Sequence, residues 1–349
     1  MIKLILALTI VAPMALGAQW TPQASGTNVE FRGLSVVSAS VVWASGTRGR
    51  VARTTDGGVT WTIDTVAGAD TLDLRAIHGA DALRAWASAA GPAERGQAKI
   101  FHTSDAHRWT QQYATSDSGV FLDAMAFWDD RHGIAMSDPV NEKLVLLSTS
   151  DGGATWTKLP MDGAPAVLPG EAAFAASGTC ITVQGTTTVW IGTGGGARAR
   201  VFRSTDRGRT WSVADTPIHA GNASSGIFSV AFADAMHGVV VGGDYTKAKT
   251  PLDNVALTSD GGRTWRLAKG SLPQGYMSAV AYMPGTKGRS LVAVGLAGTA
   301  QSTDAGQSWV MVDTVAYNSV AFASRDAGWA VGPRGRIARW TPTSRSVKP

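Results

Sequence analysis

The chain has 349 residues, of which 44% are hydrophobic and only 16% are charged, and it carries 41 glycines and 13 tryptophans. Such a composition, with charged residues below the usual level of about 25%, is typical of a turn-rich β protein with much buried aromatic surface. The formal net charge is +5, but lysine and arginine are spread along the chain without a basic block. This distribution argues against a nucleic-acid-binding protein.

The N-terminus has the features of a signal peptide. Lys3 precedes an apolar run from Leu4 to Leu16, and the small residues Gly17 and Ala18 follow. The run is too short for a permanent transmembrane helix, and no later stretch approaches about 18 apolar residues. With Cys180 as its single cysteine, the chain can form no internal disulfide. We expect an exported protein, periplasmic or secreted, without membrane insertion of the mature chain and monomeric.

An eight-residue motif, Ser/Thr-Ser/Thr-Asp-X-Gly-X-Ser/Thr-Trp, recurs five times, beginning at Thr54, Thr149, Ser204, Thr258 and Ser302. A sixth, shortened copy without the glycine covers residues 103–109. The six aspartates follow one another at intervals of about 50 residues, which predicts one small antiparallel sheet per repeat. They are Asp56, Asp105, Asp151, Asp206, Asp260 and Asp304.

The motif predicts a hairpin turn. Glycine supplies positive φ angles, the Asp and Ser/Thr side chains can accept hydrogen bonds from nearby amides, and the tryptophan packs beneath. These residues resemble the Asp-box, or BNR repeat, of sialidases, sortilin-type receptors and the photosystem II stability and assembly factors. The resemblance implies a β-propeller.

Two further strands recur before each motif. The first alternates small and large residues, as an innermost propeller strand requires because neighbouring blades converge near the axis. It is seen at residues 33–36, 124–127, 229–232, 279–282 and 319–322. The second recurs seven times, beginning at Val42, Ala85, Gly133, Val189, Gly238, Leu291 and Gly328. Seven blades are therefore predicted.

The seventh blade lacks its own fourth strand. Residues 335–340 match the third strand of the first blade at 49–53, but no motif follows them. The segment from Ala18 to Gln23 resembles a strand that follows the motif, so we expect it to complete the last blade and remove the open sheet edge. The prediction is a signal peptide (1–18), an all-β, seven-bladed propeller of four-stranded antiparallel blades (19–343) and a tail (344–349).

Chain-length variation distinguishes the two faces of this propeller. The longer segments are second-to-third-strand turns or links between blades, all on the face opposite the repeated turns: 91–97, 138–142, 159–170, 194–200, 214–226 and 244–253. Irregular loops on a rigid scaffold are where binding groups usually lie. We therefore expect the binding residues around the central opening of this face: Arg32, Arg75, Asp123, Glu171, Arg198, Arg200, Asp244 and Tyr245, with Arg334 and Arg336 nearby.

Other kinds of site fit the sequence poorly. Each repeated turn offers one carboxylate, whereas a calcium loop needs several, so its aspartate is interpreted as a turn residue and no metal is expected. The six histidines show no metal-binding spacing, and Cys180 lies in an apolar strand typical of the core. The glycines at 192–196 lead into a strand rather than a helix, which excludes a dinucleotide loop. We expect no cofactor.

Two main functions remain open. Resemblance to the photosystem II assembly factors implies a non-catalytic binding or assembly protein that holds a protein partner or membrane-complex subunit, with Arg32 and Arg75 in the contact. Carbohydrate is the alternative ligand, because sialidases and some glucanases share the repeat. A glycoside hydrolase needs placed carboxylates or a tyrosine nucleophile beside arginines. The candidates are Asp138, Glu171, Asp244, Tyr245 and Tyr317, and Arg32 alone carries over from the sialidase Phe/Tyr-Arg-Ile-Pro motif. Extracellular adhesion through the same face is a third possibility.

Overall fold

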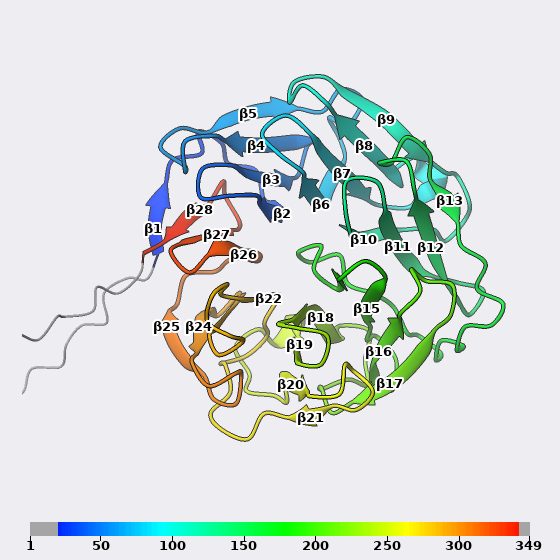
Figure 1. Ribbon diagram of the computed structural model, residues 1–349, viewed down its shortest axis with the longest axis vertical. Helices are drawn as coiled ribbons and strands as arrows, with labels where there is room; N and C mark the ends of the chain where they lie inside the picture. Colours follow the sequence, from blue (N-terminus) through cyan, green and yellow to red (C-terminus); the bar gives the residue numbers. More distant parts are fainter. Residues whose placement is uncertain (1–19, 342–349) are drawn as a thin grey trace, which may run out of the picture.

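The computed structural model describes residues 20–341, which form a ring of seven four-stranded antiparallel sheets (Figure 1). The signal peptide and the C-terminal tail predicted from the sequence lie outside the described residues. No helix among the residues described has the length and apolar character needed to cross a membrane. The seven-bladed propeller predicted from the sequence is confirmed.

The first three blades run from the axis outward in chain order. They comprise β2 (Phe31–Val36), β3 (Val42–Gly46), β4 (Arg50–Thr54) and β5 (Thr62–Thr65); β6 (Asp73–Gly79), β7 (Ala85–Ala90), β8 (Lys99–Thr103) and β9 (Trp109–Ala114); and β10 (Leu122–Phe127), β11 (Gly133–Val140), β12 (Lys143–Thr149) and β13 (Thr157–Lys158). A short 3₁₀ helix, η1 (Ala93–Arg95), interrupts the turn between β7 and β8.

The next three blades repeat this order. They comprise β14 (Ile181–Gln184), β15 (Thr188–Gly192), β16 (Ala199–Ser204) and β17 (Ser212–Thr216); β18 (Ser225–Phe232), β19 (Gly238–Asp244), β20 (Val255–Thr258) and β21 (Arg266–Leu267); and β22 (Ala279–Tyr282), β23 (Leu291–Gly295), β24 (Gly298–Ser302) and β25 (Val310–Asp313). A second 3₁₀ helix, η2 (Tyr245–Lys247), follows β19.

The seventh blade joins both ends of the described chain. Its strands are β26 (Ser319–Ser324), β27 (Ala327–Val331), β28 (Ile337–Trp340) and, outermost, β1 (Trp20–Gln23). β1 pairs antiparallel with β28, with Trp20 opposite Trp340 and Gln23 opposite Ile337. The predicted closure by the N-terminal strand is therefore confirmed.

Each repeated motif forms the turn between the third and fourth strands of its blade. In the third blade, Thr149 Oγ1 accepts a hydrogen bond from the Gly153 amide (2.8 Å) and donates one to Asp151 (2.8 Å), which in turn accepts from Thr155. Both central residues have positive φ, 74° at Gly152 and 79° at Gly153. A Cβ at Gly153 would lie 2.6 Å from the indole nitrogen of Trp86, so only glycine fits there.

Tryptophans of the second strands connect neighbouring blades. The indole N–H groups of Trp43, Trp86 and Trp190 each donate to a backbone carbonyl in the following blade, at 2.8, 2.9 and 2.8 Å. All three side chains are buried. Because each indole spans the gap between two sheets, it contributes both apolar burial and a satisfied hydrogen bond to the packing of the blades.

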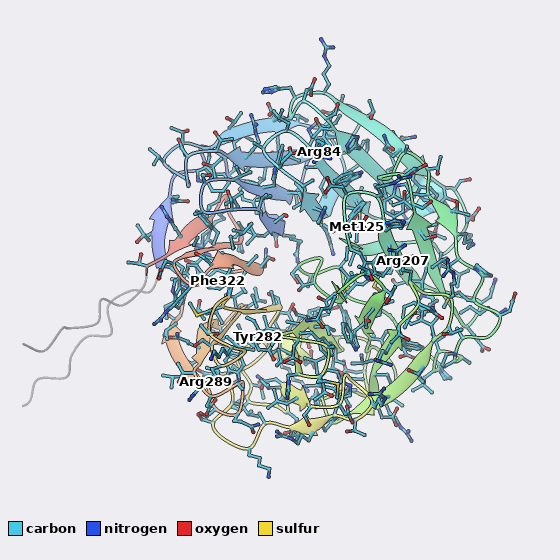
Figure 2. All side chains as sticks on the ribbon, in the orientation of Figure 1. Arg84, Met125, Arg207, Tyr282, Arg289 and Phe322 are labelled. Atoms are coloured by element: carbon cyan, nitrogen blue, oxygen red, sulfur yellow. The ribbon has the colours of Figure 1, made fainter. Side chains whose placement is uncertain are left out.

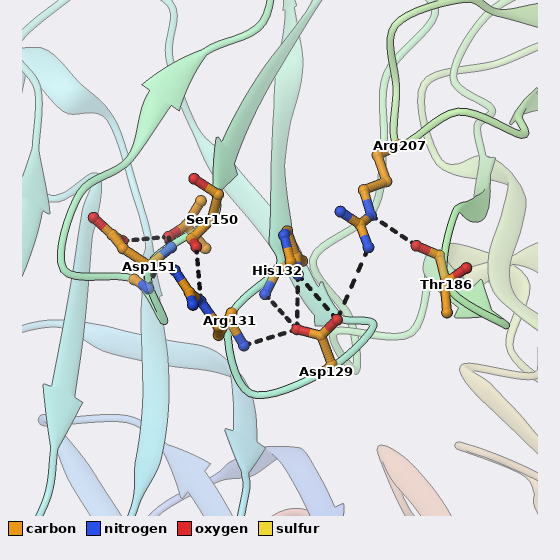
Figure 3. Close-up of polar contacts among 9 residues, drawn as sticks. Asp129, Arg131, His132, Ser150, Asp151, Thr186 and Arg207 are labelled. Carbon is orange, nitrogen blue, oxygen red and sulfur yellow. Dashed lines mark hydrogen bonds and ion pairs between the residues drawn. The ribbon is translucent and has the colours of Figure 1, made fainter.

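Polar side chains make a similar connection on the face of the repeated turns. Figure 3 shows Asp129, in the turn between β10 and β11, accepting hydrogen bonds from the Arg131 amide and from the amide and ring of His132. The guanidinium of Arg207, from the fourth blade, lies 3.9 Å from Asp129 and donates to the Thr186 carbonyl at 2.7 Å. Burial alone would raise the pKa of Asp129, but these hydrogen bonds together hold it at about 2.

Candidate functional site

A cavity of about 470 Å³ opens at the centre of the ring, on the face opposite the repeated turns. Its walls come from the starts of the inner strands, the ends of second strands and the turns beyond them. The lining residues are Glu30, Arg32, Arg75, Phe121, Asp123, Asp138, Phe174 and its neighbours 173–176, Phe228, Tyr245, Tyr276, Leu296 and Asn318. Apolar walls with a few convergent polar groups are typical of a ligand site.

A repeated irregularity of the inner strands supplies four of these side chains. The register between the first and second strands shifts at one residue in β2, β6, β10 and β18, and the skipped residues are Arg32, Arg75, Asp123 and Phe228. A β-bulge re-aims a side chain relative to its neighbours. Here all four skipped residues line the cavity. These four inner strands therefore keep their strand pairing along most of their length, and each presents one side chain to the cavity.

The small residue after each bulge allows this arrangement. A Cβ at Gly33 would lie 2.3 Å from Ser45 Oγ and 3.0 Å from the backbone nitrogen of Ile77 in the next blade. Neighbouring inner strands therefore approach too closely for a larger side chain. This close approach explains why small and large residues alternate in the sequences of the inner strands.

The floor of the cavity is a segment of the link that precedes β14. This central link segment, residues 172–179, runs from the third blade into the fourth and also contacts the first, second, fifth and sixth; Figure 1 shows it in green inside the ring, beside β15. The carbonyls of Ala176 and Ala175 accept from Arg32 (3.3 Å) and Arg75 (3.2 Å), in the first and second blades. On the other side, Ser177 Oγ donates to Ser278 O in the link before β22 (2.9 Å) and Thr179 Oγ1 donates to Ser229 Oγ (2.8 Å).

The two cavity arginines already have carboxylate partners. Arg32 pairs with Glu30 at 2.7 Å, and Arg75 pairs with Asp73 at 2.7 Å. Each guanidinium also donates to the central link segment, as described above. Both arginines therefore hold the floor of the cavity in place, while their side chains remain about one quarter exposed (23% and 29%).

The two aspartates of the cavity, Asp123 and Asp138, are in contrast incompletely partnered. Asp123 is 1% exposed, and its Oδ2 is buried without a hydrogen-bond partner. Burial, reinforced by the nearby charge of Asp138, raises the pKa of Asp123 well above its usual range, although Arg75 opposes the shift. Asp138 Oδ1 accepts from the Ala173 amide at 2.9 Å, and burial raises its pKa to about 6. The third blade thus presents two incompletely partnered carboxyl groups to the cavity.

Aromatic side chains form the remaining wall. Phe174 stacks on Phe228 with ring centroids 4.0 Å apart and an interplanar angle of 15°. Tyr276 meets Phe228 edge-on at 4.6 Å, and Tyr245 does so at 6.2 Å. Tyr245 is 47% exposed, whereas Phe228 and Tyr276 are buried. The rim of the cavity is therefore accessible and its interior is apolar on this side.

Solved structures share this architecture. A structure described as YCF48 bound to D1 peptide superposes with a TM-score of 0.65 over 96% of this chain and 100% of that chain, at 15% sequence identity. YCF48 from Cyanidioschyzon merolae gives a TM-score of 0.65 at 15% identity over 93% and 99% of the two chains. U3-55K gives 0.60 at 13% identity over 92% and 100%. The shared feature is the propeller fold. No family model and no curated protein matches the sequence.

Five of the residues predicted from the sequence line the cavity: Arg32, Arg75, Asp123, Asp138 and Tyr245. Glu171 and Arg200 lie elsewhere, in a buried ion pair with side chains 0% and 8% exposed. Glu171 also accepts from Thr193 Oγ1 (2.5 Å) and from the Leu168 amide (2.7 Å). The pair anchors the long link before β14 to the fourth blade, and its polar atoms are occupied by the fold.

Asp244 is likewise occupied. Its carboxylate accepts from the amide and hydroxyl of Thr246 (2.9 and 2.6 Å) and from Ser224 Oγ (2.8 Å), at the N-terminus of η2. Burial opposes the ionised form, but these hydrogen bonds together lower the pKa of Asp244 to about 2. Asp244 therefore fixes the loop that carries Tyr245 and does not line the cavity.

The remaining predicted residues lie farther out. Arg198 forms an exposed pair with Asp215 at 2.5 Å. Arg334 and Arg336 line a separate outer depression together with residues 22–28. Tyr317 is buried beneath Arg336, whose guanidinium carbon lies 5.8 Å from the ring centroid. None of these four residues is among those that line the central cavity.

The central link segment was not predicted from the sequence, and neither were Phe121, Phe228 and Tyr276. A signal for the bulge positions was present, since an apolar residue, the cavity residue, a small residue and another apolar residue follow one another in Phe31–Leu34, Leu74–Ile77, Leu122–Met125 and Ile227–Val230. The apolar run Ala172–Ala176 in the long link between the third and fourth blades was a second signal, because surface links rarely carry such a run.

Other titratable groups are part of the core. Cys180 is buried against Met136, with sulfur atoms 3.9 Å apart, and burial raises the pKa of its thiol. His78 stacks on Phe127 at 4.8 Å, and burial lowers its pKa to about 4. Within residues 20–341, no group of three or more His, Cys, Asp or Glu side chains is arranged to hold a metal ion.

A second cavity, of about 540 Å³, lies at the other end of the axis. It is lined by the far ends of inner strands, including Phe232, Tyr282 and Phe322, with Lys287 at its edge. Figure 2 places Tyr282 and Phe322 on the inner side of the ring. Its walls carry no paired carboxylates or buried unpartnered charge.

Proposed function

We propose that the protein is a binding or assembly protein that holds a segment of a partner polypeptide in and around the central cavity. The observation that carries this proposal is the cavity itself, whose floor is closed by the central link segment and whose rim is formed by irregular loops on a rigid ring. The similar structure of YCF48 with a D1 peptide supports a polypeptide as the class of ligand.

Site-specific photocrosslinking tests the proposal. A photoreactive amino acid is placed at Tyr245 or Leu296, which are exposed on the cavity rim, and for comparison at Val59 or Val310, which are exposed away from it. After irradiation in intact cells of the source organism, we expect the same protein adduct from both rim positions and none from the comparison positions. The proposal fails if the rim gives no protein adduct, or if all four positions give the same one.

A glycoside hydrolase is the second candidate, favoured by one observation. Asp123 and Asp138 both line the cavity, and burial raises the pKa of each, as expected for a general acid. A hydrolase would release sugar from fluorogenic glycosides at a rate that falls at least about a hundredfold in Asp138→Asn. Absence of turnover by the folded wild-type protein across a panel of glycosides would remove this candidate.

We also propose that the chain is exported, which rests on the apolar run near the N-terminus. Fractionation of the source cells, followed by N-terminal sequencing of the protein from the envelope and medium, tests this. A mature N-terminus near Gln19 supports export, and an intact Met1 in the cytoplasmic fraction overturns it.

A further inference from the structure

The charges in the central cavity are unequally partnered. Two guanidinium groups, Arg32 and Arg75, face or pair with four carboxyl groups, those of Glu30, Asp73, Asp123 and Asp138. Glu30 and Asp73 are matched with the arginines at 2.7 Å each. The two carboxyl groups that form no ion pair with these arginines are Asp123 and Asp138, both on the third blade.

The environment of Asp123 indicates a missing partner. A buried polar atom normally has a hydrogen-bond partner, and leaving one unmade is costly. Oδ2 of Asp123 has none, and the residue lines the cavity at 1% exposure. A donor that enters the cavity would meet this atom.

The wall formed by Phe174, Phe228, Tyr245 and Tyr276 adds a second preference. Faces of aromatic rings attract cations, and the apolar part of a long basic side chain packs well against them. An anionic group would instead meet the carboxyl groups of Asp123 and Asp138, while the arginines already pair with Glu30 and Asp73 and donate to the floor of the cavity, which leaves Arg32 Nε without a partner.

We propose that the central cavity receives a lysine or arginine side chain of the bound polypeptide, with Asp123 and Asp138 as its counter-charge and the aromatic wall around its apolar stem. This inference rests on the proposed function and specifies the chemistry of the bound segment.

The test uses small probes of defined charge on the full mature chain. The cations n-butylguanidinium and n-butylammonium represent the two basic side chains, and pentanoate and n-butylurea are the anionic and neutral analogues of similar size. Dissociation constants are measured by NMR titration. We expect the better cation to bind at least about tenfold more tightly than either analogue. Equal or tighter binding of pentanoate overturns the proposal.

Isosteric variants locate the site. Asp123→Asn and Asp138→Asn each remove one carboxyl group while keeping its volume, and the carboxamide introduced by the second change can still accept from the Ala173 amide through its oxygen. We expect about tenfold weaker cation binding in each. The matched control is Asp253→Asn, an exposed residue in a loop of the same face, which should bind as the wild type does. Unchanged cation binding in both folded cavity variants overturns the proposal.

The two levels of inference fail separately. If rim photocrosslinking gives a partner adduct but the cations do not bind, the cavity recognises a group other than a cationic side chain, and the proposed binding function still holds. If the cations bind and depend on Asp123 and Asp138 while the rim gives no adduct, the cation site stands and the polypeptide partner does not. Thermal unfolding of each variant confirms that it is folded before any comparison.

Discussion

Trp20 and Trp340 lie opposite each other in the pair formed by β1 and β28, with their rings edge-on and the centroids 4.9 Å apart. They join the two ends of the described chain. Both side chains are buried, and the Trp20 indole also donates to Thr299 Oγ1 at 3.0 Å in the sixth blade. The seam of the ring therefore contains an aromatic pair that also contacts the adjoining blade.

Trp20→Ala should strongly destabilise the ring. Loss of a buried tryptophan costs about 3–5 kcal/mol, because its apolar contacts are lost and a cavity remains. Urea-induced unfolding followed by tryptophan fluorescence measures the free energy of unfolding. The control is Thr21→Ala on the exposed side of the same strand, which should change stability by less than about 0.5 kcal/mol. Equal effects of the two substitutions would contradict the role assigned to the buried Trp20 side chain in holding the seam.

Trp190→Phe and Trp265→Phe should differ although the chemical change is the same. The Trp190 indole is fully buried and donates to the Gly261 carbonyl at 2.8 Å, whereas the indole nitrogen of Trp265 is buried without a partner. We expect Trp190→Phe to lower the free energy of unfolding by about 2–3 kcal/mol, and Trp265→Phe to lower it by at most about 1 kcal/mol. A reversed order, measured by urea unfolding, contradicts the role assigned to the hydrogen bonds between blades.

Glu171→Gln should destabilise the fold, because Glu171 anchors the long link and does not line the central cavity. Removing one charge leaves the buried Arg200 guanidinium without its counter-ion, at a cost of about 3–5 kcal/mol. The double variant Glu171→Leu/Arg200→Met should recover much of that loss, because it removes both charges together. Thermal unfolding of the two variants checks this. A single variant as stable as the wild type would show that the pair does not anchor the long link.

Asp138→Asn should change how stability depends on pH. Burial raises the pKa of Asp138 to about 6 in the folded protein, above the value of 3.8 for an unperturbed group. Between these values the folded protein holds a proton that the unfolded chain has lost, so this group makes stability fall as pH rises and reach a plateau above about pH 6. Because the asparagine introduced at this position cannot titrate, the stability of the variant does not fall in this way as the pH rises. We expect it to match the wild type near pH 4 and to exceed it by about 1–3 kcal/mol at pH 7.5.

Several neighbours share the electrostatics of Asp138. Asp123, Arg75 and Arg32 line the same cavity, with Asp73 and Glu30 paired to the arginines, the phenols of Tyr245 and Tyr276 across the cavity, and the thiol of Cys180 beside Asp123. Loss of the Asp138 charge also lowers the pKa of Asp123, because that charge is one cause of its elevation. Urea unfolding at pH 4, 5, 6 and 7.5 measures the effect. Parallel pH profiles for variant and wild type would contradict it.

The architecture could be predicted because each of its elements repeats. The second strand, which recurs seven times from Val42 to Gly328, gave the number of blades, and the match between residues 18–23 and the strands that follow the motif predicted the closure. The cavity was harder to predict, because a bulge at Arg32 or Asp123 shifts one residue out of register, and strand periodicity does not show which residue is skipped.

Contacts between distant segments explain the other differences. Glu171 and Arg200 have the composition of an exposed loop, and only the folded link brings them together in a buried pair. Phe174 reaches the cavity because residues 172–179 cross the ring and stack against Phe228. No local pattern specifies such a crossing, since the residues that fix it belong to five other blades.

The pairing of β1 with β28 also has a consequence for folding kinetics. Trp20 is among the first residues of the described chain to emerge from the ribosome, and its partner Trp340 is among the last. Contacts of such large sequence separation form slowly, because the loop between them must first be closed. The first six blades can each assemble from neighbouring residues, whereas the seventh must wait for the whole chain. Until β1 and β28 pair, the edge of β28 and the apolar face of β1 stay open to unwanted pairing, so this interval is when the chain is most exposed to aggregation and proteolysis.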